Sequence, residues 1–274
     1  IIMYRYALII IILVSSLSLF SQDEDYIKQE YFKAESYHLD KENDTTIFIL
    51  TSLLSYLDSA SESNNDELFT KHKAETYNKL GLYFQKYGYL LKSALAYNNG
   101  LQLVQGKEDY LDIRSKLNLH LGLLYVKLGN SDSSFYLERS ESQAIDIQEN
   151  DVRSVLMKEL GRIDEGIEFA RNNQDSIYLS NFYYLKANNY IDSDLDLAKI
   201  YFDSARFVMP FLDDENILGL GGSKSKLQHF EFHIYITDYF LKKDQVDSAF
   251  AHCYQAEYLS NFFNDIEISD LSLE

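Results

Sequence analysis

Two histidines and a group of aspartates are the residues in this sequence whose spacing could bind a metal ion. His229 and His233 are four positions apart, so on a helix both imidazoles would lie on one face. The H-E-x-x-H zinc signature requires a glutamate directly after the first histidine, and a zinc site needs a third ligand. The segment has neither the glutamate placement nor an evident third ligand. We therefore expect an ordinary helix face here.

The aspartates resemble the start of a calcium-binding loop. Asp192, Asp194 and Asp196 alternate as such a loop requires, and Asp203 stands at its twelfth place. The sixth place, however, is Leu197, where the loop needs glycine for its sharp turn. We expect an acidic turn whose carboxylates cap the following helix.

Two further motifs could bind phosphate or act as a nucleophile. The segment Gly219–Ser225 is rich in glycine, but it lacks the Gly-Lys-Ser/Thr order of a phosphate loop and follows no strand pattern, so we expect a linker. Cys253 is the single cysteine, and its spacing predicts a buried, inert packing position. No Ser-His-Asp or paired-carboxylate set can be assembled from the spacing. We predict a chain that is not an enzyme and needs no cofactor.

The composition favours a helical protein with a substantial core. Hydrophobic residues make up 46% of the 274 residues, which excludes a disordered acidic tail. One proline is too few for the many turns of an all-β fold. The net charge of -18 argues against nucleic acid and anionic membrane surfaces, so an electrostatic partner should be basic.

The N-terminal segment has the pattern of a secretory signal. Arg5 precedes the apolar run Ala7–Val14, small polar residues follow, and the first acidic residue is Asp23. We expect residues 1–21 to be a cleaved signal peptide or, if uncleaved, an N-terminal membrane anchor. The predicted location is the periplasm or cell envelope, with membrane contact only through that uncleaved segment.

Internal repeats carry the strongest signal for the fold. The clearest unit begins with a predicted helix that carries an aromatic residue, a Leu-Gly pair and a second aromatic residue, at Tyr77, Leu80, Gly81 and Phe84. A glycine turn follows at Gly88. The next predicted helix has a small–large–small pattern, at Ser93, Tyr97 and Gly100. This pattern resembles the tetratricopeptide repeat. Small residues at the crossing let the two backbones approach closely.

Weaker copies follow along the chain. Two copies keep the Leu-Gly pair, one at Leu121, Gly122 and Tyr125 and the other within residues 160–167. Two later copies keep the small–large–small pattern, one at Ala198, Phe202 and Ala205, followed by Pro210, and the other at Ala249, Cys253 and Ala256. The aligned small residues are separated by 41, 32, 32 and 51 positions, whereas the nominal repeat has 34. We interpret this as a diverged array with one interruption.

The resemblance implies an all-α, right-handed superhelical solenoid of antiparallel helix pairs. The expected organisation is a signal segment at 1–21, atypical N-terminal helices at 22–76, repeats at 77–214, a linker at 215–226, a repeat at 227–265 and an incomplete repeat helix at 266–274. In this family the first helices line a groove that holds a peptide or a partner's helix. The exposed polar residues expected there are Asn78, Lys79, Asn118, Lys186 and Asn189.

Two functions fit these expectations. The first is an exported, non-catalytic scaffold that binds protein or peptide partners, possibly basic ones. The second is the N-terminal sensory region of a truncated signalling protein, a histidine kinase or a helix-turn-helix regulator. The alternative is motivated by residues 266–274, which read as a helix that ends before it finds a partner.

Overall fold

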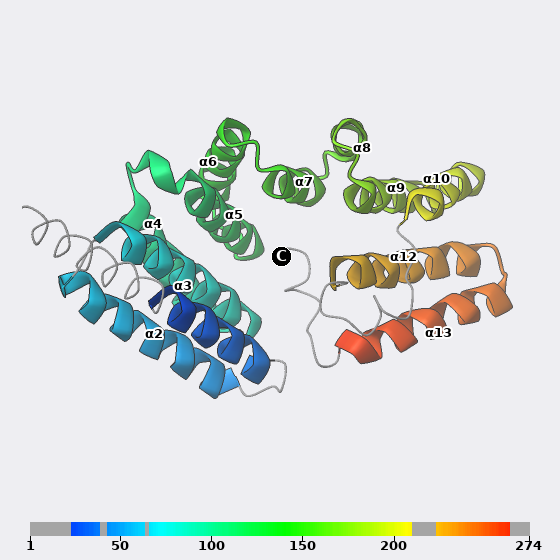
Figure 1. Cartoon of the computed structure of the whole chain (residues 1–274). Coiled ribbons are helices and arrows are strands. Elements are labelled where there is room, and N and C mark those ends of the chain that lie inside the picture. The colour runs from blue at the N-terminus through cyan, green and yellow to red at the C-terminus, as the bar shows by residue number, and fades with distance from the viewer. Residues whose placement is uncertain (1–22, 39–42, 64–65, 210–222, 264–274) are drawn as a thin grey trace, which may run out of the picture. The chain divides into compact units, whose positions relative to one another are not determined.

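A computed structural model describes residues 23–38, 43–63, 66–209 and 223–263, and within these ranges all regular structure is helical, with no strand. The predicted all-α class is therefore confirmed. Within each unit, helices that are adjacent in the chain pack in pairs (Figure 1). The chain divides into two compact units, Ile1–Ile113 and Arg114–Glu274, and each is described by itself.

The first unit contains two helix pairs. A helix of residues 23–38 is followed by α2 (Asn43–Ser63), and α3 (Asp66–Lys86) packs against α4 (Leu90–Val104). A short 3-10 turn, η1 (Glu108–Tyr110), leads into α5 (Leu111–Lys127), which continues into the second unit.

The second unit continues the alternation of first and second helices. Its remaining helices, in chain order, are α6 (Ser133–Asp146), α7 (Asn150–Glu159), α8 (Ile163–Asn172), α9 (Ser176–Tyr190), α10 (Leu195–Val208), α12 (Ser223–Lys242) and α13 (Val246–Phe263). Helix α9 packs on α10 and also on α12, and α12 packs on α13.

Most of the described turns end the preceding helix in the same way. At Gly88, Gly129 and Gly161 the backbone is left-handed, with φ of 80, 65 and 68°, which glycine adopts without a steric cost. The next residue then donates its N–H to a carbonyl five positions back, for example Tyr89 to Phe84 at 2.7 Å. This Schellman motif satisfies carbonyls that the helix end would leave unpaired.

The crossing of α3 and α4 has the close approach that the repeat pattern predicted. The Ser93 hydroxyl donates to the Gly81 carbonyl at 2.7 Å, so a second-helix side chain reaches first-helix backbone. A Cβ atom placed on Gly81 would lie 2.2 Å from Cε1 of Tyr97, whose ring is fully buried. Gly122 meets Leu137 in a similar way in the second unit, at 2.6 Å.

The first helix pair repeats this design more closely than the sequence suggested. The Thr46 hydroxyl donates to the Ala34 carbonyl at 3.3 Å, and these residues have the same separation as Ser93 and Gly81. The expected boundary at residue 76 falls within α3, which is one continuous helix from Asp66 to Lys86.

Most of the residues assigned to repeat packing are buried or half-buried. The buried ones are Leu80, Gly81, Tyr97, Leu121, Gly122, Ala198, Phe202, Ala205, Ala249 and Ala256. The half-buried ones, on first helices, are Tyr77, Phe84 and Tyr125. Pro210 and residues 266–274 lie outside the described residues.

Cys253 is exposed, so the prediction of a buried thiol was wrong. Phe202, at the equivalent position of α10, is buried because its ring meets Phe232 and Tyr239 of the next first helix, α12. Within the described part of the chain, no helix follows α13 to cover Cys253 in the same way.

The last two first helices of the second unit run parallel with a constant offset. The Gln228 side chain donates to the Ile177 carbonyl at 2.9 Å, and the Tyr184 and Tyr235 rings stack with centroids 5.2 Å apart. Both pairs are separated by 51 positions, the same interval that separates Ala198 from Ala249. The last four residues of the expected linker at 215–226 belong to α12, which begins at Ser223, and the others lie outside the described residues.

Among the described helices, none combines the length and apolar character needed to cross a bilayer. The N-terminal segment of the signal-peptide prediction lies outside the described residues.

We predict that Gly81→Val destabilises the first unit by about 1–3 kcal/mol, because the side chain must displace the buried Tyr97 ring. Urea unfolding followed by circular dichroism at 222 nm measures this change. Gln102→Val, at an exposed position of α4, controls for the helix cost of a β-branched residue. Equal unfolding midpoints for the two variants would contradict the close-approach account.

Candidate functional site

The histidine motif contributes to a side-chain pair between α12 and α13. Nδ1 of His233 lies 2.8 Å from Nδ1 of His252, and the His252 ring stacks on Phe240 with an interplanar angle of 8°. A hydrogen bond between two Nδ1 atoms requires one ring to donate and the other to accept, so the pair shares a single proton. His229 and Arg206 lie near enough to act on His233 electrostatically.

The surroundings of this pair keep it neutral. Burial, then His252, His229 and Arg206, lower the pKa of His233 to about 4. The pKa of His252 is also lowered, by burial and Arg206. Across the described residues, no group of three or more His, Cys, Asp or Glu side chains is arranged to hold a metal ion. The pair joins α12 to α13.

The aspartates of the calcium-like motif have separate roles. Asp194 caps α10 by accepting from the Leu197 backbone N–H at 2.9 Å, as the sequence predicted. Asp192 pairs with Lys242 at 2.6 Å and Asp203 with Lys199 at 2.6 Å, so their carboxylates do not converge.

Two of the five expected groove residues are not on the surface of their units. Asn78 and Asn118 are buried, at 9% and 3% exposed, so the prediction that they are exposed was wrong. The reason is visible for Asn118, which donates to Gln143 Oε1 of α6 at 2.9 Å and joins a helix pair. A side chain that already bonds across the core cannot also present its amide to a peptide.

The two lysines of this set lie against aromatic rings. Lys79 Nζ is 5.3 Å from the ring centroid of Tyr31. Lys186 Nζ is 4.9 Å from the centroid of Tyr201 and also pairs with Asp164. Asn189 is exposed. The cation–π contact holds Lys79 against the preceding helix pair, and Lys186 is held by Tyr201 of α10 and Asp164 of α8.

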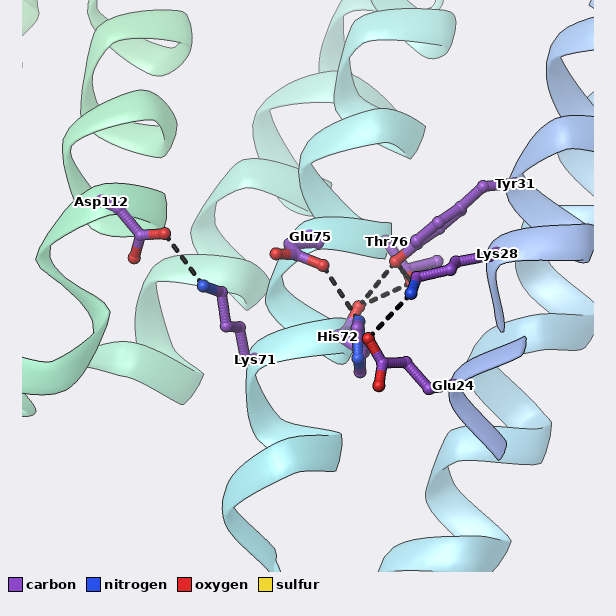
Figure 2. A network of polar contacts seen from close by, with 8 residues as sticks. All are labelled: Glu24, Lys28, Tyr31, Lys71, His72, Glu75, Thr76 and Asp112. Carbon is purple, nitrogen blue, oxygen red and sulfur yellow. Dashed lines mark hydrogen bonds and ion pairs between the residues drawn. The ribbon is translucent and has the colours of Figure 1, made fainter. Parts of the chain in front are cut away.

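In the first unit, polar side chains join the helix of residues 23–38 to α3 (Figure 2). The Tyr31 hydroxyl lies 2.8 Å from the Thr76 hydroxyl and donates to the His72 carbonyl at 3.1 Å. The His72 imidazole pairs with Glu75 at 3.0 Å. Burial raises the pKa of Tyr31, so it remains a neutral phenol.

Two ion pairs flank this network in Figure 2. Glu24 and Lys28 pair at 3.0 Å, and the pKa of Glu24 is lowered, mainly by Lys28 and more weakly by His72. Lys71 reaches Asp112, at the start of α5, at 3.1 Å. Glu24 and Lys28 have opposite charges, as do Lys71 and Asp112, so the charges of these two pairs largely cancel.

The His72–Glu75 pair resembles two parts of a catalytic triad, but the nearby hydroxyl is engaged elsewhere. Thr76 Oγ1 donates to the His72 backbone carbonyl at 2.7 Å and contacts Tyr31. A nucleophile must instead present its proton to the imidazole nitrogen. The geometry of this network is suited to joining helices.

The second unit has an equivalent polar cluster across three first helices. Lys158 of α7 lies 3.3 Å from both carboxylate oxygens of Glu231 in α12, and the Tyr184 hydroxyl of α9 donates to the same carboxylate. Tyr184 is fully buried, and its pKa is raised well above the usual value by burial and then by Glu231. This cluster holds the three helices together.

Sequence reasoning missed this cluster and the His252 partner. Glu231 is separated from Lys158 by 73 positions and from Tyr184 by 47, so helical spacing could not pair them. The 51-residue offset between repeats would have aligned Tyr184 with Tyr235, and that was the one available signal.

Some buried polar atoms near these helices lack a hydrogen-bond partner. They are Ser180 Oγ, Asn181 Oδ1 and Gln228 Oε1 on α9 and α12. Gln228 nevertheless bonds Ile177 through its Nε2 atom.

Several second helices carry large apolar side chains in solvent. Leu91 and Leu95 of α4 are 86% and 61% exposed, and Phe207 of α10 is 90% exposed. On α13, Phe250 is 73% exposed and Tyr254 is 59% exposed. These residues contribute little to the core, so burial against another molecule would be favourable.

We predict that Tyr184→Phe destabilises the second unit by about 1–3 kcal/mol, because a hydrogen bond to a carboxylate is lost while the ring is kept. Chemical denaturation measures the change. Tyr254→Phe removes an exposed hydroxyl and is expected to stay within about 0.5 kcal/mol of the parent. An unchanged free energy of unfolding for Tyr184→Phe would show that the Glu231 cluster does not stabilise the unit.

We also predict that acid weakens the second unit through its histidines. The pKa values of His233, about 4, and buried His120, about 3, lie below the 6.5 of an ordinary imidazole. The unfolded chain therefore takes up protons first, and stability is lost as the pH falls from about 6.5 toward 4. Histidine NMR titration should give one signal with a pKa near 4 that disappears in His233→Gln. A value near 6.5 for that signal would contradict the buried pair.

No protein-family model and no curated protein matches this chain. Among solved structures, it is similar to the crystal structure of BtubC (BKLC) from P. vanneervenii, with a TM-score of 0.56 and 15% sequence identity. The match covers 81% of this chain and 92% of that chain. At this identity the likeness concerns the fold, and it agrees with an all-α architecture of paired helices.

Proposed function

We propose that this chain is a non-catalytic helical-repeat scaffold, similar to tetratricopeptide arrays, that binds a protein or peptide partner. The observation that carries this proposal is the exposure of large apolar side chains on second helices in both units. Leu91 is 86% exposed in the first unit and Phe207 is 90% exposed in the second.

The helices that carry these side chains are already packed through other faces. In α4 the buried positions include Ser93, Ala96 and Tyr97, and Leu91 and Leu95 lie on the opposite side. Folding of the pair gains little from the two leucines, whereas burial of each in an interface would contribute about 1.5–3 kcal/mol. Exposed apolar groups on ordered helices are typical of protein interaction surfaces.

The polar groups of the first helices favour this assignment. Asn118 and Glu231 bond within the array, and Lys79 lies over a neighbouring ring. These contacts leave fewer free hydrogen-bonding groups for a ligand on the first helices than the family resemblance implied. We therefore assign the partner to the exposed apolar positions. Export to the cell envelope is part of the proposal and rests on the sequence of residues 1–21.

Site-specific photocrosslinking of the full chain in its source cells tests this proposal. With p-benzoylphenylalanine at Leu91 or Phe207, we expect a discrete adduct in the envelope fraction that excess unlabelled chain removes. The same group at exposed Asn130, in the turn after α5, is the control position. Adducts at neither apolar position, or equal adducts at Asn130, would refute the scaffold assignment.

A further inference from the structure

One exposed face of α13 combines aromatic and acidic side chains. Asp247, Phe250, Tyr254 and Glu257 follow one another at spacings of three, four and three, so they lie along one side of the helix. All four are exposed; Phe250 is 73% exposed and Tyr254 is 59% exposed. We refer to these four residues as the α13 face.

The equivalent face of α10 shows what the array itself requires at these positions. Helix α10 begins at Leu195 and α13 at Val246, which gives the same 51-residue offset as their buried alanines. The corresponding residues of α10 are all exposed: Asp196, Lys199, Asp203 and Arg206. The two central ones form an ion pair at 2.6 Å. Helices α12 and α13 follow α10 and still leave this face in solvent.

The aromatic pair is therefore not explained by stacking of a further repeat. Where a repeat does follow, a charged and self-neutralised pair is sufficient at these two positions. Phe250 and Tyr254 replace that pair with two large apolar surfaces. Another molecule that covers these surfaces would remove them from water, and that burial is favourable.

The charges on α13 restrict the chemistry of that molecule. Asp247 lies about one turn before the aromatic pair and Glu257 about one turn after it, roughly 15 Å apart along the helix. Helix α13 contains no Lys or Arg that could neutralise them. A complementary helix would place apolar side chains against the rings and Lys or Arg near each carboxylate. Cations there can also contact the ring faces.

A second copy of this chain is a poor occupant. If two α13 faces met in antiparallel orientation, Asp247 of one would lie against Glu257 of the other. In parallel orientation each carboxylate would meet its own equivalent. Both arrangements bring like charges together, and the whole chain carries a net charge of -18.

We propose that the α13 face binds a cationic amphipathic helix of a partner protein. Apolar side chains of that helix cover Phe250 and Tyr254, and basic residues about ten positions apart pair with Asp247 and Glu257. This inference rests on the proposed scaffold function and specifies the partner class for one surface of it.

Fluorescence anisotropy with a synthetic helix tests the inference on the full chain. The probe is a fluorescein-labelled 18-residue peptide with leucines on one face and a lysine about one turn beyond each end of that face. The counterpart has both lysines replaced by glutamate. We expect micromolar binding of the lysine peptide, at least tenfold weaker binding of the glutamate peptide, and weaker binding of the lysine peptide at higher salt.

Variants of the chain locate the binding site. Phe250→Lys with Tyr254→Asp copies the exposed ion pair of α10 and should weaken binding of the lysine peptide at least tenfold. Phe32→Lys removes an exposed aromatic side chain (67% exposed) from a first helix, that of residues 23–38, and should leave binding within about twofold. Circular dichroism and thermal unfolding should be unchanged in both variants, because the replaced side chains are exposed.

Several results would overturn the inference. They are equal binding of the two peptides, undiminished binding by the Phe250→Lys/Tyr254→Asp variant, or a dimer in sedimentation that this variant dissociates. If crosslinks form at Leu91 or Phe207 while the lysine peptide fails to bind, only the inference about α13 fails. If neither result is obtained, the scaffold function fails as well.

Discussion

Close approach of paired helices is the constraint on which the rest of this structure depends. A hydroxyl of the second helix bonds backbone of the first, at Ser93 and Gly81 and again at Thr46 and Ala34. Such contact is possible only where the first helix carries a very small side chain. Large side chains then fill the space beside the crossing, as Tyr97 does next to Gly81, and Phe202 of α10 also contacts Phe232 of the next first helix.

This packing accounts for the positions of most polar groups as well. Side chains on first helices that approach a neighbouring helix are buried enough that each needs a partner, and Tyr31, Asn118 and Glu231 find theirs inside the array. The outward faces of second helices have no such requirement. Leu91 and Phe250 are therefore free to contact another molecule without disturbing the core.

Local sequence patterns were sufficient for some features and insufficient for others. The Leu-Gly pair at Gly81 and the small–large–small pattern around Ala198 predicted buried crossings, because spacing within one helix pair determines them. The exposure of Asn118 was predicted wrongly because its amide bonds Gln143 on the paired helix, and the burial of Cys253 because it depends on which helix packs against α13. Pairings such as His233 with His252 join two helices across a turn, and that geometry is not encoded in a single helical period.

The constant 51-residue register between α9 and α12 has a consequence for how such arrays change. Two first helices can remain aligned turn for turn, from Ile177 and Gln228 to Tyr184 and Tyr235, even though their separation far exceeds the usual repeat length. Stacking thus depends on which helix faces meet and is independent of the length of chain that connects them. Insertions and deletions between helix pairs would be neutral for packing, so related arrays can lose a recognisable sequence period while they keep their architecture.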